Sequence, residues 1–285
     1  MRVWLYRIFS FCGVGTMAFF AALISAGFFF FLPHRTWVSV RFYGLLYPDR
    51  SVWYLLYCTW RQYQSFARVF SERLELRNED RITYTSKGWE HLEEAAANGS
   101  GGVILMSHAG SWEVAARLFR RNKLRMMLYM GVKNKEQVER LQKADLLAED
   151  LKIVATPEGE SSPMEMLEGL RFLKEGGFVS MAGDRVWNPH RIVPVSFLGK
   201  TAQLPDTPYL LAALSKTPLF IFYSFRTAPR KYHIQVSKPL LISPASRRER
   251  PAAVQACAGE YGRSLEEAVR SHPAQWYHFD RFTQD

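Results

Sequence analysis

Short apolar segments alternate with longer amphipathic segments from residue 98 onward. The period of each segment predicts strands at 103–107, 124–130, 152–155, 178–182, 192–198, 218–226 and 231–238. Helices are predicted at 112–122, 135–149, 163–175, 207–216 and 251–271. Strands that alternate with helices usually pair in parallel, because each crossover helix carries the chain back to the same end of the sheet. We therefore expect an α/β fold with a largely parallel mixed sheet flanked by helices.

The residues before this alternation include a long apolar run. No charged residue occurs from position 8 to position 32, which is long enough for a helix that crosses a bilayer. A cleavable signal would end soon after a small residue such as Ala26, but the Phe-rich residues 28–32 extend the apolar run further. We therefore expect a retained membrane helix over residues 1–34. The alternative is a helix that lies on the membrane or packs against the following domain.

Aromatic and basic residues are interleaved at helical spacing over residues 36–77. This pattern predicts one or two amphipathic helices, and Trp and Tyr beside Arg favour the bilayer interface. Part of the aromatic stripe could instead pack against the following domain. The expected division is a membrane helix at 1–34, interfacial helices at 35–80 and an α/β domain at 81–285. Positive charge is denser on the C-terminal side of the apolar run, which places the α/β domain in the cytoplasm.

The formal net charge of +10 favours an anionic partner. Phospholipid head groups and an acidic carrier protein both fit this charge. No nucleic acid partner is expected, because the Lys and Arg residues are scattered and no zinc-finger spacing, RNP motif or basic helix occurs. Cys12, Cys58 and Cys257 show no CxxC spacing, which predicts neither a disulfide framework nor a metal site.

His108 and Glu113 directly follow the first strand of the alternating region. On one continuous helix, side chains at this spacing lie about 140° apart, so they meet only if the chain turns between them. Gly110 permits a turn, and Ser111 is a suitable N-cap for a helix that begins at Trp112. Glu113 can then hold the Nδ1 proton of His108 and leave Nε2 to accept a hydroxyl proton. The alternative is a structural histidine and a glutamate that only favours the helix N-terminus.

Residues 107–113 read Ser-His-Ala-Gly-Ser-Trp-Glu and resemble the HX4(D/E) signature of glycerolipid acyltransferases. The form H-x-G-x-W-E is similar to that of the late acyltransferases of bacterial lipid A biosynthesis, of the lauroyl and myristoyl type. The resemblance continues through the apolar N-terminal run and the segments at 183–185, 193–199, 204–205 and 273–276. In this order and spacing, the set of motifs is typical of the superfamily.

This resemblance implies acyl transfer without a covalent enzyme intermediate. His108 would take the proton from an acceptor hydroxyl that attacks a fatty acyl thioester, and Glu113 would orient the imidazole. Backbone amides around Gly110, or the side chain of Arg185, would stabilise the resulting oxyanion. Asp184 would brace Arg185 or the acceptor.

Asp184, Arg185, Ser111 and Lys133 are the residues expected to bind substrate. The family's Arg-Pro pair before an Asn is replaced here by Val132-Lys133 before Asn134, so Lys133 stands in for the Arg. The family's Asp-x-Asp reads Asp-Arg-Val at 184–186. In the family, both positions handle the polar head of the acceptor. Because both differ here, the resemblance leaves the identity of the acceptor open.

The predicted protein is an acyltransferase of the bacterial inner membrane. It would move a fatty acyl chain from an acyl carrier protein thioester, or from acyl-CoA, to a hydroxyl of a lipid or glycolipid acceptor similar to a lipid A precursor. No metal and no cofactor besides the acyl thioester are expected. Alternative acceptors are a lysophospholipid, an ornithine-type lipid or a polyene metabolite. Two other classes stay open: a lipid hydrolase or thioesterase, and a non-catalytic lipid-binding protein with a structural His108.

Overall fold

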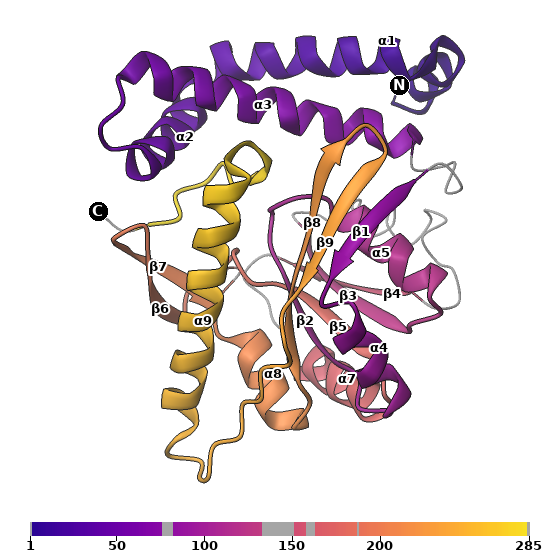
Figure 1. The fold of residues 1–285 in the computed structure, drawn as a ribbon, viewed down its shortest axis with the longest axis vertical. Helices are drawn as coiled ribbons and strands as arrows, with labels where there is room; N and C mark the ends of the chain where they lie inside the picture. Colours follow the sequence, from indigo (N-terminus) through magenta and orange to yellow (C-terminus); the bar gives the residue numbers. More distant parts are fainter. Residues whose placement is uncertain (1, 76–81, 133–150, 158–162, 187, 284–285) are drawn as a thin grey trace.

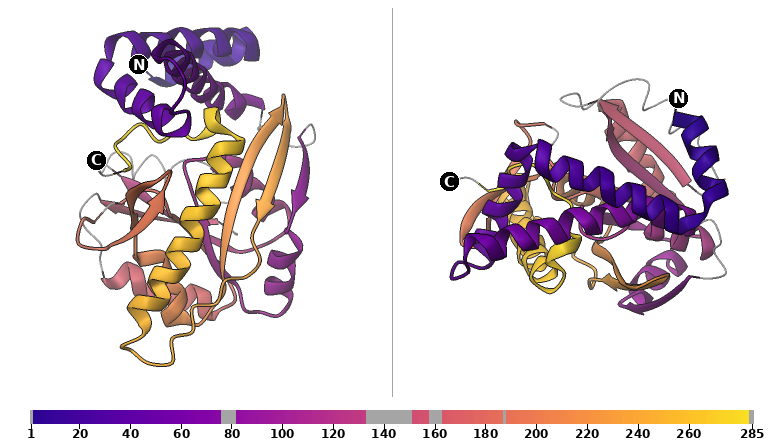
Figure 2. Two further views of the ribbon diagram at one scale, coloured as in Figure 1. Left: turned by 60° about the vertical axis from the view of Figure 1, so that its left-hand side comes forward. Right: turned by 90° about the horizontal axis from the view of Figure 1, so that it is seen from above.

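A computed structural model describes residues 2–75, 82–132, 151–157, 163–186 and 188–283 (Figure 1). Three N-terminal helices form a layer above an α/β domain: α1 (Arg2–Phe31), α2 (Pro33–Leu46) and α3 (Val52–Glu75). A view turned about the vertical axis shows this layer at the same end of the domain, and the view from above shows its helices crossing over the domain (Figure 2). The helix expected at 135–149 lies outside the described residues.

The sheet of the α/β domain has the strand order β1-β9-β8-β2-β5-β3-β4 over the described residues. Its strands are β1 (Thr83–Lys87), β2 (Gly102–Met106), β3 (Met126–Val132), β4 (Leu151–Pro157), β5 (Phe178–Ala182), β8 (Leu219–Ala228) and β9 (Lys231–Val236). Only the β8–β9 hairpin is antiparallel within this sheet of described strands, and the other neighbours pair in parallel. The predicted α/β class with a largely parallel mixed sheet is confirmed.

Two strands lie where none was expected. The edge strand β1 is polar and mostly exposed, so it lacks the apolar signal of a core strand. The chain over 192–198 was expected to form one strand, but β6 (Ile192–Phe197) and β7 (Lys200–Pro205) form a separate antiparallel hairpin. Leu198 and Gly199, with φ of 50° and 75°, make its two-residue turn.

Helices cover both faces of the main sheet. Alternate residues of β2 enter two different cores, because side chains of a strand point to opposite faces. Val103 and Leu105 pack in the core shared with α7 (Pro163–Lys174), α8 (Thr207–Ser215) and α9 (Arg250–Ser271). The core on the other face is shared with α4 (Glu90–Ala97) and α5 (Trp112–Arg121). Strand β2 therefore packs against helices on both faces of the sheet.

The helical layer packs against the C-terminal tail, defined as residues 273–283, which begins with the 3₁₀ turn η2 (Pro273–Gln275). Tyr43 of α2 donates a hydrogen bond to the carbonyl of Pro273 (3.0 Å), and Gln62 of α3 donates one to the carbonyl of Trp276 (2.6 Å). Both donors are buried. The tail is thus fixed between the helical layer and the sheet.

The membrane helix expected at 1–34 corresponds to α1 and the start of α2. Within the described residues, no single helix meets the length and apolarity of a membrane span, whereas Gly15–Phe31 and Pro33–Leu46 meet them as a pair bent by 90°. The bend has a local cause, since Pro33 ends the hydrogen-bonding pattern of α1 and suits the first turn of α2. One side of α1 packs on α3, where Ser25 donates to the carbonyl of Tyr63 (2.7 Å).

Candidate active site

The connection from β2 to α5 makes a tight turn at Gly110. Its φ is +84°, and a Cβ added there would lie 2.0 Å from the carbonyl oxygen of Ser224. Only glycine fits this close approach without strain. Ser111 follows in extended conformation at the N-cap position, and α5 begins at Trp112. The predicted turn and helix start are confirmed, although the Ser111 side chain makes no capping bond to the described helix.

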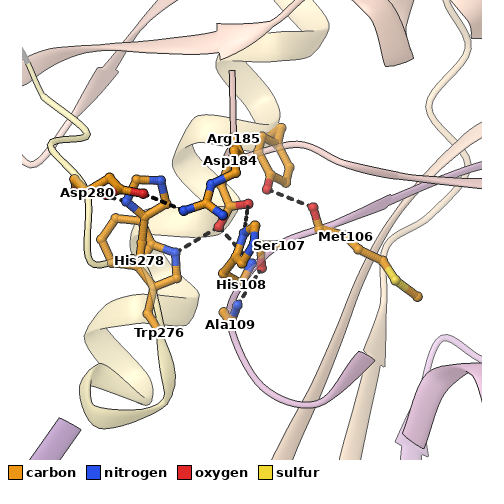
Figure 3. Close-up of polar contacts among 10 residues, drawn as sticks. Met106, Ser107, His108, Ala109, Asp184, Arg185, Trp276, His278 and Asp280 are labelled. Atoms are coloured by element: carbon orange, nitrogen blue, oxygen red, sulfur yellow. Dashed lines mark hydrogen bonds and ion pairs between the residues drawn. The ribbon is translucent and has the colours of Figure 1, made fainter. Parts of the chain in front are cut away.

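His108 is held by a buried aspartate at the end of the neighbouring strand (Figure 3). Its Nδ1 lies 2.8 Å from Oδ1 of Asp184, and its backbone N–H donates to Oδ2 over 2.7 Å. The indole of Trp276 donates to the same Oδ2 over 2.9 Å. The backbone amide and the indole can only donate, so Oδ2 of Asp184 accepts both of these hydrogen bonds. This arrangement fixes the imidazole and leaves Nε2 as its other nitrogen.

Parallel strand pairing brings these two residues together. Met106, the last residue of β2, pairs with Ala182, the last residue of β5. The chain leaves both strands at the same edge, where the amide of Gly183 donates to the carbonyl of Met106 (2.7 Å). Functional side chains of α/β sheets gather at this carboxyl edge. The positions of His108 and Asp184 therefore follow from the order of the strands.

Asp184 is ionised although it is only 1% exposed. Burial alone would raise its pKa, but the charge and hydrogen bond of His108, together with the indole donor of Trp276, lower the pKa well below the usual value. An anionic Asp184 requires the proton of a neutral His108 to sit on Nδ1. Nε2 is then the nitrogen that can accept a proton.

The partner of Nδ1 differs from the sequence prediction, which gave this proton to Glu113. The structure pairs Nδ1 with Asp184 instead. Glu113 lies in the first turn of α5, as expected, and is half-buried. Asp184 was expected to brace Arg185 or the acceptor, but its carboxylate contacts His108 and Trp276. Adjacency of β2 and β5, which local sequence does not encode, decides which carboxylate contacts Nδ1.

The amides around Gly110 also differ from their predicted role as oxyanion donors. The amide of Gly110 donates to the carbonyl of Gln275 (2.8 Å), and that of Ser111 donates to the carbonyl of Ser224 (2.9 Å). These donors already hold the turn against the tail and β8. The amides that follow, at 112–114, belong to the first turn of α5, where a helix has no acceptors of its own. They replace Gly110 as candidate oxyanion donors.

Arg185 pairs with Asp280 of the C-terminal tail, which sequence reasoning did not assign to the site. The tail also places His278 with its ring centroid 6.1 Å from that of His108, stacked on Trp276. Burial lowers the pKa of His278, because the charged ring is disfavoured away from water. Residues 273–276 belonged to the family resemblance, but nothing in them signalled a contact with Asp184. Lys133 lies outside the described residues.

A cavity of about 560 Å³ lies beside the start of α5. Gly110, Ser111 and Tyr277 line it, together with Arg68 of α3 and Arg226 of β8. The predicted substrate residue Ser111 therefore borders an open space near His108. Asp184, which was also predicted to bind substrate, is buried and contacts His108.

An α/β fold with a histidine–carboxylate pair at the carboxyl edge of parallel strands defines a site that can remove a proton from a hydroxyl group. The chain belongs to the bacterial lipid A biosynthesis acyltransferase family, whose model matches residues 59–282. This match confirms the family that the motifs predicted and supports an acyltransferase. None of the curated proteins compared with the chain matches it.

Proposed function

We propose that the protein transfers a fatty acyl chain from an acyl carrier protein thioester to a hydroxyl of a lipid or glycolipid acceptor related to lipid A precursors. Family membership supports acyl transfer to a lipid. The observation that carries the mechanism is the 2.8 Å contact between Nδ1 of His108 and the buried carboxylate of Asp184. Acyl-CoA is the alternative donor.

The reaction follows from the orientation of His108. Its Nε2 removes the proton of the acceptor hydroxyl while the oxygen attacks the thioester carbonyl, and the carboxylate of Asp184 stabilises the imidazolium. The tetrahedral oxyanion accepts hydrogen bonds from the first-turn amides of α5 or from Arg185. Its collapse breaks the carbon–sulfur bond, and the leaving thiolate takes the proton from the imidazolium. We expect the chemistry to need no metal.

Membrane association at the cytoplasmic face of the inner membrane is part of this proposal. The helical layer exposes a set of large apolar side chains that includes Phe19, Leu23, Ile24, Phe28, Phe30, Phe31, Trp37 and Trp53. Exposed apolar patches of this kind mark interaction surfaces, and a bilayer surface suits a helix with Phe and Trp on its open side. The net charge of +10 favours anionic lipids and an acidic carrier protein.

The test is incubation of the purified full chain with labelled acyl carrier protein thioester and a panel of acceptors, namely lipid A precursors, lysophospholipids and ornithine-type lipids. We expect an acylated lipid from the unaltered chain, and a loss of about 10²-fold or more with His108→Ala, since general-base catalysis contributes this much. Retained folding is checked by thermal unfolding. An active His108→Ala variant would refute the base assignment, and release of free fatty acid without acylated lipid would favour a hydrolase.

A further inference from the structure

A second cavity, of about 770 Å³, is lined by other residues of the same C-terminal tail. It is enclosed by α2, the β6–β7 hairpin and the C-terminal tail, and we name it the tail cavity. Basic side chains from all three segments line it: His34, Arg35, Arg41, Lys200 and Arg281. Asp280 is the acidic residue among the described residues that line the cavity, and its carboxylate pairs with Arg185. The tail cavity is therefore strongly cationic.

The inner wall of the tail cavity is part of the histidine site. Trp276 and His278 both line the cavity, and both are buried. Trp276 donates to Asp184, and the ring centroid of His278 lies 6.1 Å from that of His108. A ligand in the tail cavity would thus lie one side chain away from the imidazole. This distance suits a substrate with its anionic group a few bonds from its reacting hydroxyl.

The rim of the tail cavity continues into an exposed apolar surface. Helix α1 ends at Phe31, and His34 and Arg35 follow in the first turn of α2. Phe30 and Phe31 are 68% and 84% exposed. Trp37 of α2 is exposed as well. A cationic hollow beside an apolar surface matches an amphiphile, with its phosphate in the hollow and its hydrocarbon chains on the surface.

We propose that the tail cavity binds the phosphate-bearing head group of an anionic acceptor lipid. That the bound lipid is the acyl acceptor rests on the proposed function. Arg41 and Lys200 line the cavity from two different elements, α2 and the hairpin, so a phosphate that reaches both would gain charge-assisted contacts from both. The phosphopantetheine arm of a carrier protein shares the phosphate chemistry, but it lacks paired hydrocarbon chains for the apolar rim.

The experiment measures lipid binding without any acyl donor, so that its result does not depend on turnover. The full chain in neutral detergent is titrated with micelles that carry phosphatidic acid, and with micelles that carry diacylglycerol as the uncharged counterpart. The test variant is Arg41→Gln/Lys200→Gln. The matched control is Arg247→Gln/Arg248→Gln, which removes the same charge from an exposed turn before α9. We expect affinity for phosphatidic acid to fall about tenfold or more in the test variant, and to stay unchanged in the control.

Equal binding by the test variant and the unaltered chain would overturn the proposal. An equal loss in both double variants would also overturn it, because the attraction would then be a property of net charge alone. Soluble phosphopantetheine and inorganic phosphate are titrated in the same way. If one of them binds the unaltered chain but not the test variant, while phosphatidic acid binds neither, the cavity takes another phosphate source and the proposal is wrong. If the test variant loses lipid binding while the unaltered chain acylates no acceptor, the cavity assignment stands and the proposed function fails.

Discussion

At the scale of single residues, the site depends on a carboxylate with three donors around it. Asp184 accepts from the ring and the backbone of His108 and from the indole of Trp276. Removal of a buried charge that holds several donors leaves those donors without a partner. Asp184 is therefore a positioning residue for His108, and its effect on the reaction can be separated from that of Glu113.

Asp184→Asn should lower kcat by about 10²-fold or more, because an amide cannot accept all three hydrogen bonds and favours the wrong imidazole tautomer. The measurement is acyl transfer under saturating acceptor, with thermal unfolding to monitor the fold. Glu113→Gln is the matched comparison. If Glu113→Gln abolishes turnover and Asp184→Asn does not, the orienting role belongs to Glu113, as the motif alone suggested.

At the scale of elements, the turn between β2 and α5 decides where His108 lies. The turn is fixed by the amides of Gly110 and Ser111, which bond to the tail and to β8. Gly110 has a left-handed φ and also approaches the carbonyl of Ser224. Gly99 has a similar φ of +67° but no atom within 4 Å of an added Cβ. Substitution of Gly99 tests the cost of the left-handed backbone alone, and substitution of Gly110 adds steric overlap with Ser224.

Gly110→Ala should lower the free energy of unfolding more than Gly99→Ala does. A non-glycine residue in the left-handed region costs about 1–2 kcal/mol, which both variants share, and Gly110→Ala adds the displacement of β8 or of the turn. Chemical denaturation measures both variants. Acyl transfer should fall only in Gly110→Ala, since the turn carries His108. Equal losses of stability would show that the contact with Ser224 relaxes freely.

At the scale of the whole molecule, the helical layer joins an apolar surface to the site. Buried hydrogen bonds from α2 and α3 hold the tail, and the tail in turn holds Asp184 and the turn at Gly110. The layer is therefore both a membrane-facing surface in the proposed function and a structural support for the site. Its exposed side chains can be altered without touching the buried contacts.

Phe28→Ser/Phe31→Ser should weaken binding to anionic vesicles and leave thermal stability nearly unchanged. Both side chains are exposed, at 53% and 84%, so their replacement removes apolar surface available to a bilayer without opening the core. Vesicle flotation measures the effect. Leu241→Ser, at a residue that is 70% exposed in the segment between β9 and α9, is the control. Equal flotation of the Phe variant and the unaltered chain would remove this surface from the membrane contact.

The sequence by itself determined what depends on neighbouring residues. The period of apolar residues predicted the α/β class, and the order Gly110, Ser111, Trp112 predicted the turn and the start of α5, because backbone freedom and helix capping act over a few residues. The motif also predicted His108 as the reactive base, which stays a prediction until turnover is measured.

Only the tertiary structure decided which carboxylate meets His108. Asp184 lies 76 residues further along the chain, and it becomes a neighbour because β5 pairs with β2 in the sheet. The same holds for the tail, where Trp276 reaches Asp184 across 92 positions. Such contacts depend on strand order and on packing between distant segments, which no local pattern of residues encodes.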